Sequence, residues 1–342
     1  MKPRERVIAV LKGEIPDRVP RFEIWIDALL EEMGQPDMPT AHAAFGQDSI
    51  MMPTHIPGES NAWKNGTDEW GRVWKDGMYV SGVLKSTTDL ARFSVPVTAA
   101  EKFFDKGEIS AIRQGFPDHL IMYGSHLGPF MAAYMAMGFE RFFTSLFDNP
   151  SLVHRVLEDR TEWAIAMFSW AIENGAEVLI LGEDIAYKKS PMISTKMWRE
   201  FVLPYHHRIV DSLARPVIFH SDGNLLSALP LVIEAGFIGY HSLEPAAGMD
   251  LAAVKREYGR DLILAGNVDV RVLAGDDMQL VRAEVDRCIA QGAPGGRYLI
   301  ATCNSIFHGL NPKAVLEMFS YEDEVGFYSA DGQITHQENY DD

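Results

Sequence analysis

Imidazole, carboxylate, amide and thiol side chains recur in this sequence at the points where short apolar runs end. The runs, such as residues 178–182 and 217–220, have the length and composition of strands buried on both faces of a parallel sheet. Parallel strands that close a barrel present their carboxyl ends on one rim, where catalytic groups gather. The sequence therefore predicts an enzyme with a site on that rim, built from Glu23, His55, His126, Glu183, Asp184, His220, Asp222, His241, Glu244, Asn267, Asp269, Cys303 and Asn304.

The string Val-Ile-Phe-His-Ser-Asp-Gly-Asn at residues 217–224 carries the strongest chemical signal. His220 and Asp222 are two residues apart, so strand alternation directs both side chains to the same side, and Gly223 allows a sharp turn after them. An imidazole and a carboxylate in this relation can share a divalent metal, or the acid can orient the imidazole as a base. The structural alternative is a hydrogen-bonded pair that closes the end of the strand.

Glu183 and Asp184 directly follow the apolar run at 178–182. Adjacent carboxylates raise each other's pKa and require a cation, a bound metal or substrate hydrogens as partners. They are therefore predicted to handle protons in the site, with neutralisation by Lys188 and Lys189 as the structural alternative.

The cysteines and one histidine pair lead to separate expectations. Cys303 follows the last apolar run, where a thiol either ligates zinc or is simply buried. Cys288 lies on the apolar stripe of a helix and is expected in the core. His206 and His207 come just after Pro204, and we expect them on a helix surface rather than among the ligands.

Helices with readable boundaries lie between the apolar runs. One is expected to begin at Asn149-Pro150 and to end at Asn174-Gly175, because Asn caps a helix start, Pro fits its first turn and Gly ends it. A second is expected to begin near Asp276 and Asp277 and to end at Gly292.

The alternation of strand and helix predicts one α/β domain, a (β/α)8 TIM barrel over residues 1–330 with a polar C-terminal tail over 331–342. An open doubly wound sheet is the competing fold, but the chain has no GxGxxG or GxxxxGKS/T phosphate loop. The eight expected strands lie at residues 19–25, 49–53, 120–124, 178–182, 217–220, 237–241, 262–266 and 298–301.

Residues 67–86 do not follow the alternation of strand and helix. Their pattern predicts a β-hairpin around Asp76-Gly77, inserted after the second strand. Its aromatic residues, which include Trp70 and Trp74, either line a substrate cleft or pack against the barrel.

Composition excludes several classes of protein. Of the 342 residues 47% are apolar and 23% charged, which fits a globular domain and not a disordered chain. The net charge of −17 opposes binding to nucleic acid and to anionic membranes. No apolar stretch reaches the length of a membrane span, no signal peptide is apparent, and two cysteines are too few for a disulfide framework. We therefore expect a cytoplasmic protein.

Five strings along nearly the whole chain form a further pattern: DSIMMP at 48–53, GPFMAAYM at 128–135, Ser190-Pro191 leading to Phe201 and Pro204, HSDGN at 220–224 and AGNVD at 265–269. Together these strings resemble the uroporphyrinogen decarboxylase superfamily. The resemblance implies a (β/α)8 barrel and suggests that dimers are common. It also implies one of two chemistries: metal-free decarboxylation, or methyl transfer with a corrinoid partner protein and a zinc ion held by His-x-Cys and a later Cys.

The methyltransferase pattern is partly retained. By resemblance His220 matches the zinc-binding histidine, Asp222 takes the place of the first cysteine, and Cys303 lies at or beside the later cysteine. Such a set would hold zinc with one position open for a substrate atom. A carboxylate in place of a thiolate favours an oxygen-bearing substrate, such as a methyl ether.

The decarboxylase pattern is less complete. The position of the catalytic aspartate is His55, the late histidine is replaced by Asn304, and the N-terminal arginine string is missing, with Arg18 and Arg21 in a different context. Tyr134 is retained. A substrate with many carboxylates is therefore implausible without its arginines.

The leading hypothesis is a methyltransferase that acts on a small methylated substrate with a corrinoid partner protein and zinc. Glu183 or Asp184 would move protons or orient the metal ligands through hydrogen bonds. Substrate contacts are expected from Glu23, His126, His241, Asn267, Asp269 and Asn304. A metal-free decarboxylase that uses His55, Tyr134 and Asp184 is the alternative. A non-catalytic barrel that binds a corrinoid or tetrapyrrole is the third possibility.

Overall fold

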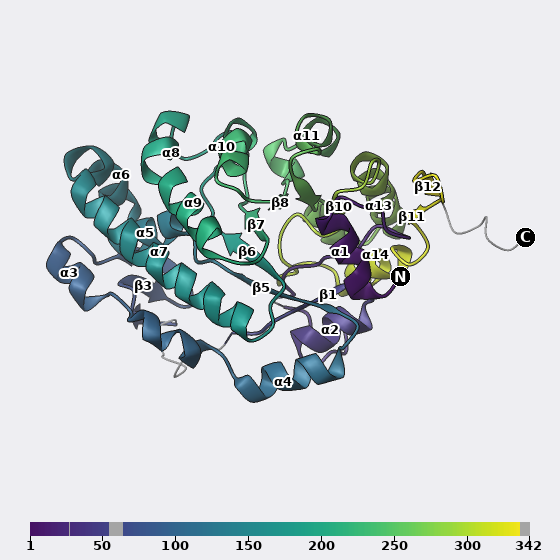
Figure 1. Cartoon of the computed structure of the whole chain (residues 1–342), viewed down its shortest axis with the longest axis horizontal. Helices are drawn as coiled ribbons and strands as arrows, with labels where there is room; N and C mark the ends of the chain where they lie inside the picture. The colour runs from purple at the N-terminus through teal and green to yellow at the C-terminus, as the bar shows by residue number, and fades with distance from the viewer. Residues whose placement is uncertain (27, 55–63, 336–342) are drawn as a thin grey trace, which may run out of the picture.

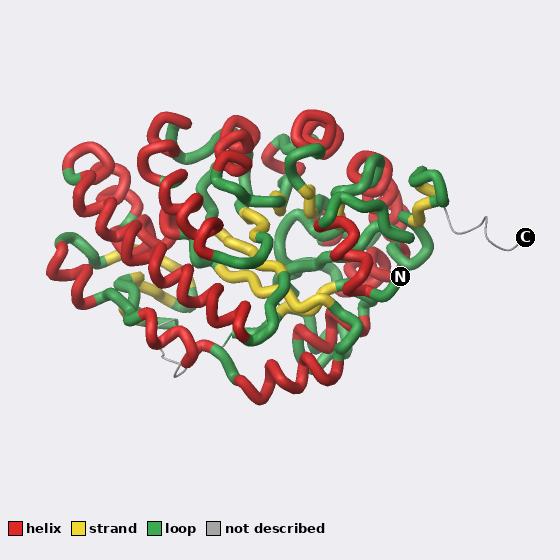
Figure 2. Tube along the Cα trace, in the orientation of Figure 1, coloured by secondary structure: helices red, strands yellow, loops and turns green. Residues whose placement is uncertain are grey.

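The computed structural model describes residues 1–26, 28–54 and 64–335, and it contains one curled parallel sheet wrapped by helices (Figures 1 and 2). Neighbouring strands follow chain order, so helical crossovers return the chain to the same edge each time. The seven strands, in sheet order, are β1 (Ser49–Met51), β5 (Leu120–Ser125), β6 (Val178–Gly182), β7 (Val217–His220), β8 (Gly239–His241), β9 (Ile263–Ala265) and β10 (Tyr298–Leu299).

The expected first strand at 19–25 is not a regular strand in the structure. The segment makes single bridges, and its backbone joins both edges of the sheet: Phe22 N–H donates to Ile300 O (2.8 Å) and Asp48 N–H donates to Arg21 O (2.9 Å). Pro20 has no N–H, and the N–H of Glu23 donates to a side chain (2.8 Å), so a continuous ladder cannot form. The count of eight strands is therefore not confirmed.

The helices cover the outer face of the sheet (Figure 1), and the two helices whose starts were predicted from the sequence are capped as expected. Asn149 accepts from the N–H of Leu152 (3.3 Å) ahead of Pro150, and Asp277 caps the helix that ends at Gly292. The helices are α1 (Pro3–Leu11), α2 (Met38–Ala44), α3 (Thr87–Arg92), η2 (Val97–Phe103), α4 (Lys106–Gly115), α5 (Pro129–Met137), α6 (Phe139–Asp148), α7 (Pro150–Glu173), α8 (Thr195–Phe201), α9 (Leu203–Ser212), η3 (Leu226–Ala228), α10 (Leu229–Glu234), η4 (Pro245–Ala247), α11 (Leu251–Tyr258), α12 (Val270–Leu273), α13 (Met278–Gly292) and α14 (Pro312–Tyr321).

A small antiparallel sheet of three strands occupies the region of the expected hairpin. It comprises β2 (Gly66–Thr67), β3 (Arg72–Lys75) and β4 (Met78–Gly82), with Asp76 and Gly77 both at positive φ in the turn. Tyr79 donates its hydroxyl hydrogen to Met135 O (3.0 Å), which fixes this sheet to helix α5.

Two short strands near the C-terminus, β11 (Phe327–Tyr328) and β12 (Ile334–Thr335), form a second antiparallel pair. The expected tail at 331–342 therefore begins within a paired segment, and residues 336–342 lie outside the described part of the chain.

Apolar side chains fill both the interior of the curled sheet and the layer between strands and helices. Ile180 and Ile218 belong to the inner cluster, whereas Leu179 and Phe219, their chain neighbours, belong to the outer one. This alternation is what strands buried on both faces require.

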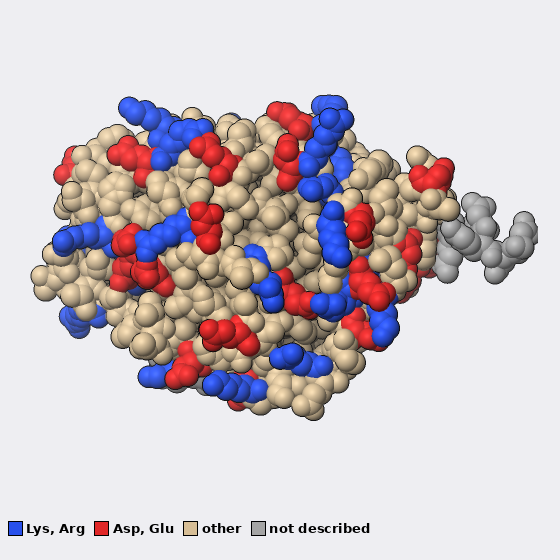
Figure 3. Space-filling model, viewed as in Figure 1, with Lys and Arg blue, Asp and Glu red and all other residues tan. Residues whose placement is uncertain are grey.

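The visible surface carries mixed charge. On the face drawn in Figure 3, Lys and Arg side chains lie among Asp and Glu side chains, without a basic field. No helix in the described residues is long and apolar enough to cross a membrane.

Candidate functional site: a histidine and two carboxylates beside an aromatic cavity

Three side chains at the carboxyl ends of β6 and β7 converge on one point. His220 is the last residue of β7, Asp222 follows it by two, and Asp184 follows the end of β6 by two. Their ligand atoms all lie within 4.8 Å of one another, and His220 Nε2 is 4.0 Å from one oxygen of each carboxylate. The predicted placement of His220 and Asp222 on the same side of β7 is what allows this.

Hydrogen bonds fix which nitrogen of His220 carries its proton. His241 Nε2 lies 3.0 Å from the carbonyl oxygen of Thr302, which can only accept, so this nitrogen of His241 must donate. Burial lowers the pKa of His241 to about 4, so its other nitrogen, Nδ1, accepts from Nδ1–H of His220 at 2.7 Å. The pKa of His220 is well below its ordinary value because of burial and the nearby His241 and His126. His220 is therefore neutral at pH 7, with the lone pair of Nε2 facing the two carboxylates.

Asp222 is the most perturbed carboxylate of the site. Burial, followed by the charge of Asp184, raises its pKa to about 7. One of its oxygens accepts from Asn304 Nδ2 (2.5 Å), whereas Oδ1 is buried without a hydrogen-bond partner among the described residues. A buried carboxylate oxygen without a donor is costly unless a cation or a ligand completes it.

Polar groups from the opposite side of the sheet support this arrangement. Glu23, fully buried, accepts from the N–H (3.0 Å) and the hydroxyl (2.7 Å) of Thr302, whose carbonyl oxygen holds His241. The predicted substrate residues Glu23 and His241 thus lie behind His220. Such outer hydrogen bonds orient a metal-binding histidine and raise its basicity.

The donor set fits a divalent ion. One neutral imidazole nitrogen and two carboxylate oxygens suit zinc, which bonds these atoms at roughly 2.0–2.2 Å. Two carboxylates would balance the charge of the ion. A bound ion would also supply the partner that Oδ1 of Asp222 lacks among the described residues. His220, Asp222 and Asp184 are therefore the residues that could hold such an ion.

Cys303, expected as the third ligand, does not fall within this group of described residues. Its backbone N–H donates to Val268 O (2.9 Å), and the N–H of Val270 at the start of α12 interacts with the thiol. Burial and the negative charges of Asp269 and Asp222 raise the pKa of the thiol to about 12. Cys288 is fully buried, as predicted.

Glu183 points away from Asp184, because adjacent residues after a strand face opposite sides. Its side chain is fully buried and accepts from Met131 N–H (2.9 Å) and from Nε2 of His206. The expectation that His206 lies on the helix surface is wrong, since it is 1% exposed. The partner of Glu183 is thus His206. It is not Lys188, which the sequence offered as a neutralising cation, because the Lys188 side chain is exposed.

Substituting Glu183 by Ala is expected to destabilise the fold by about 3 kcal/mol, because it leaves buried donors of His206 and Met131 unpaired. Urea unfolding measures this, and Glu173→Ala at the exposed end of α7 is the matched control, with an effect within about 0.5 kcal/mol. Unchanged stability with complete loss of activity would instead give Glu183 a catalytic role.

The remaining predicted residues fall into three groups. Asn304 and His126 lie at the site, and Tyr134 contacts it through its hydroxyl, which donates to the carbonyl oxygen of Asp184 (2.9 Å). Asn267 is fully buried and donates to Leu243 O (2.8 Å), and Asp269 caps α12 and pairs with Arg271, so a contact of either residue with substrate stays a prediction. His55 lies outside the described residues.

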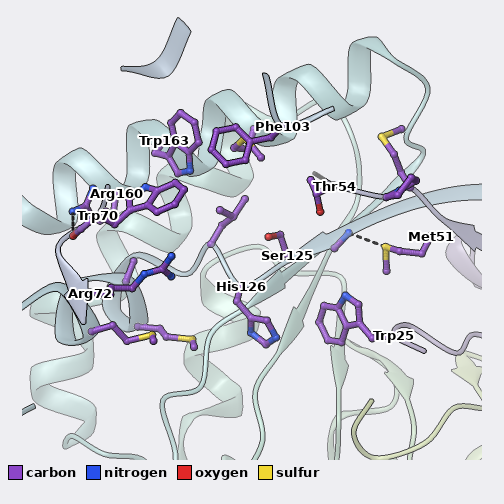
Figure 4. A pocket seen from close by; sticks show the side chains of 18 of the residues that line it. Trp25, Met51, Thr54, Trp70, Arg72, Phe103, Ser125, His126, Arg160 and Trp163 are labelled. Atoms are coloured by element: carbon purple, nitrogen blue, oxygen red, sulfur yellow. Dashed lines mark hydrogen bonds between the residues drawn. The ribbon is translucent and has the colours of Figure 1, made fainter. Parts of the chain in front are cut away.

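A cavity of about 530 Å³ is lined in part by Trp25 and His126 (Figure 4), whose rings contact the ring of His220. Its near wall is Trp25 stacked on His126 (ring centres 5.1 Å apart), and the Trp25 ring meets His220 edge-on at 4.9 Å. Gly182 makes room for His126, since a Cβ there would lie 2.8 Å from its Nδ1. The other walls are aromatic and thioether side chains, with Trp70, Arg72, Trp74, Phe103, Met131, Arg160 and Trp163 among them.

Sequence reasoning missed Trp25 and Arg72. Trp25 is the last residue of the expected first strand, so its position at the carboxyl end of that strand could have been used to place it near the site. Arg18 and Arg21, in contrast, lie at the other end of the sheet, where Asp48 just before β1 pairs with Arg18 and bonds the backbone N–H of Arg21.

A curled parallel sheet with polar groups gathered at its carboxyl edge defines a TIM-barrel-like α/β protein. The family model described as uroporphyrinogen decarboxylase (URO-D) matches residues 41–325. The chain therefore belongs to the uroporphyrinogen decarboxylase family.

Relatives within this family are enzymes of two kinds. The chain is 25% identical over 244 residues to a uroporphyrinogen decarboxylase of Pseudomonas fluorescens, covering 68% of this chain and 65% of the relative. It is 26% identical over 187 residues to a methylated-thiol–coenzyme M methyltransferase of Methanosarcina mazei, covering 54% and 49%. It thus spans less than two thirds of either relative. A methylcobamide:CoM methyltransferase of Methanosarcina acetivorans is 22% identical over 287 residues, covering 78% and 82%.

Among solved structures, a methyltransferase from Methanosarcina mazei superposes with a TM-score of 0.75. The superposition covers 95% of this chain and 99% of that one at 21% identity. A likeness at this identity establishes the shared fold.

Proposed function

We propose that the protein is a zinc-dependent methyltransferase that transfers the methyl group of a small O-methylated substrate to the reduced corrinoid of a partner protein. The methyl C–O bond would break, the corrinoid would supply the electron pair of the new bond to the methyl carbon, and the substrate oxygen would keep its electron pair and take a proton from solvent. His220, Asp222 and Asp184 are the proposed ligands, with Asp184 in the position that the sequence pattern suggested for Cys303. Zinc would supply a Lewis acid for the substrate oxygen.

The observation that carries this proposal is the direction of the Nε2 lone pair of His220. His241 donates from Nε2 to Thr302 O and accepts at Nδ1 from His220, so the proton of His220 is on Nδ1. Nε2 of His220 therefore has no proton, and it lies 4.0 Å from one oxygen of Asp184 and one oxygen of Asp222. An unprotonated nitrogen beside two carboxyl groups is favourable only when a cation, or a proton on Asp222, reduces the repulsion, and separations of 4.0 Å are too long for a direct hydrogen bond. A simple hydrogen-bonded pair would place a proton donor there instead.

The residues of the chain have distinct roles in this proposal. The ion would be bound by His220, Asp222 and Asp184. Asn304 donates a hydrogen bond to the second oxygen of Asp222. The stacked rings of Trp25 and His126 would form the wall of the substrate side and limit the access of water. Two carboxylates and one imidazole form a harder donor set than thiolates, which favours an oxygen-bearing substrate over a thiol. The relatives named as methyltransferases support this reading. Arg18 and Arg21 lie at the other end of the sheet, beside Asp48.

Zinc titration of chelator-treated protein tests the ligand set. We expect one equivalent to bind, Asp184→Asn to weaken binding at least about tenfold, and Cys303→Ser to leave it nearly unchanged, because the thiol is outside the group. Isothermal titration calorimetry measures the three affinities. A large effect of Cys303→Ser with none for Asp184→Asn would restore the original assignment.

Absence of zinc binding in the unsubstituted protein, together with carbon dioxide release from a carboxylated substrate, would establish the decarboxylase alternative. Binding of a corrinoid protein without turnover of any methylated substrate would favour the non-catalytic reading.

A further inference from the structure

One residue after the last strand of the sheet is hydrogen-bonded to the supports of two proposed zinc ligands. Thr302 is fully buried, and it is absent from the site residues predicted from the sequence. Its carbonyl oxygen accepts from Nε2–H of His241 (3.0 Å), and its hydroxyl donates to the carbonyl oxygen of Asn304. His241 in turn accepts from Nδ1–H of His220 (2.7 Å). The side-chain amide of Asn304 donates to Asp222 (2.5 Å). Thr302 is thus one residue removed from both ligands.

These contacts join strands that are not neighbours in the sheet. The sheet order is β7, β8, β9, β10, so the segment after β10 supports residues that follow β8 and β7. The carbonyl oxygen of Cys303 accepts from the hydroxyl of Ser242 (2.6 Å), beside the bond between Thr302 and His241. Two consecutive carbonyl oxygens therefore hold two consecutive residues at the end of β8, which fixes their register.

Glu23 fixes the position of Thr302 from the segment that joins the two edges of the sheet. One of its carboxyl oxygens accepts from the N–H of Thr302 (3.0 Å), and the other lies 2.7 Å from the hydroxyl oxygen. The hydroxyl has one proton, which it can donate to Glu23 or to the carbonyl oxygen of Asn304. The bond from the N–H holds Thr302 in either case, so the hydroxyl stays between the two acceptors.

The side-chain amide of Asn304 has a defined orientation. Its Oδ1 accepts from the N–H of Ser305 (2.7 Å), so Nδ2 is the end that donates to Oδ2 of Asp222 (2.5 Å). That bond leaves Oδ1 of Asp222 as the oxygen without a partner among the described residues. The contact of the Thr302 hydroxyl with Asn304 therefore bears on which oxygen of Asp222 is open to an ion.

We propose that Thr302 is a positioning residue for two of the zinc ligands. Its carbonyl oxygen orients His220 through His241. Its hydroxyl orients Asp222 through Asn304. This inference rests on the proposed function for the identity of the bound ion. Removing a direct hydrogen-bond partner of a metal ligand costs about 10–100-fold in affinity, and the hydroxyl of Thr302 is one residue further from the ion, so its removal should cost about fivefold to tenfold.

Zinc titration of chelator-treated protein tests the role of the hydroxyl. Thr302→Val replaces the hydroxyl by a methyl group and should weaken zinc binding about fivefold to tenfold, whereas Thr302→Ser, which keeps the hydroxyl, should stay within about twofold. Thr161→Val is the matched control, because Thr161 is also fully buried and its hydroxyl donates to the carbonyl oxygen of Leu157 in α7 (2.7 Å). It should lower the melting temperature as Thr302→Val does and leave the zinc affinity unchanged.

Two further measurements separate positioning from general damage to the site. Thr302→Val combined with Asn304→Ala should weaken zinc binding no more than Asn304→Ala alone, because the hydroxyl acts through Asn304. Nitrogen NMR of zinc-free protein labelled in histidine should still show the proton of His220 on Nδ1 in Thr302→Val, because the carbonyl oxygen that holds His241 remains.

An unchanged zinc affinity in Thr302→Val, additive losses in the double variant, or a proton moved to Nε2 of His220 would each overturn the inference. Absence of zinc binding in the unsubstituted protein would instead remove the proposed function. The coupling between Thr302 and Asn304 would then be measured from the melting temperatures of the same variants with chelator present, and additive decreases there would overturn it.

Discussion

Replacing His220 by Asn is expected to eliminate tight zinc binding and, with it, methyl transfer. His220 contributes the one nitrogen donor of the three-residue group. The loss should exceed the roughly 10–100-fold reduction that removal of an outer hydrogen-bond partner causes. Calorimetric zinc titration measures it, and thermal melting with chelator present checks that the fold is intact.

A second variant separates binding from orientation. His241→Asn removes the group that fixes the protonated nitrogen of His220 without removing a ligand, so it should weaken zinc binding by about 10–100-fold. Bound zinc stabilises the native protein by mass action, about 2.7 kcal/mol at one hundred times the dissociation constant. If His220→Asn retained this stabilisation, the ion would have to be held elsewhere.

Replacing Asp222 by Asn is expected to stabilise the zinc-free protein at pH 8 while it weakens zinc binding. Burial and the charge of Asp184 raise the pKa of Asp222 to about 7 in the native state, against an ordinary value of 3.8. Between these two values the native state holds more protons than the unfolded chain, so stability falls as pH rises through this window. The neutral amide removes that loss and can still accept from Asn304.

The gain should therefore depend on pH. At pH 8 it is expected to be on the order of 1–2 kcal/mol after solvent screening, a rise in melting temperature of about 2 °C or more, and it should nearly vanish at pH 4. Thermal melting at several pH values in the presence of chelator measures it. A gain of equal size at both pH values, or a loss at pH 8, would contradict the assignment of Asp222 as the strained carboxylate of the site.

A variant that gains stability and loses binding is the expected signature of a site built for a ligand. The unpartnered oxygen of Asp222 and its raised pKa make the zinc-free state less stable than it would be with neutral groups. Glu183, with both oxygens occupied, should behave in the opposite way and lose stability on substitution.

Local pattern in the sequence was sufficient for much of the fold and for half of the site. The runs at 178–182 and 217–220 are β6 and β7 with the expected bounds, and Asn149-Pro150 begins α7. The two-residue spacing of His220 and Asp222 placed both on one side of the same strand end. Such features depend on a few adjacent residues, so periodicity and capping rules reveal them.

The remaining features depend on contacts between residues far apart in the chain. Whether Asp184 or Cys303 joins His220 is set by the loops after β6 and β10, and the orientation of His220 is set by Thr302, 82 positions away in sequence. The burial of His206 against Glu183 likewise requires α9 to be packed on the sheet.

By itself, then, the sequence determined the order of elements, the edge at which reactive groups gather and the pairing of His220 with Asp222. Only the tertiary structure decided which carboxylate completes that pair, which nitrogen of His220 carries the proton, and that Trp25 and Arg72 border one cavity. The physical reason is that side-chain direction within a strand follows from backbone alternation, whereas proximity between strands and across an inserted sheet follows from how the whole chain packs.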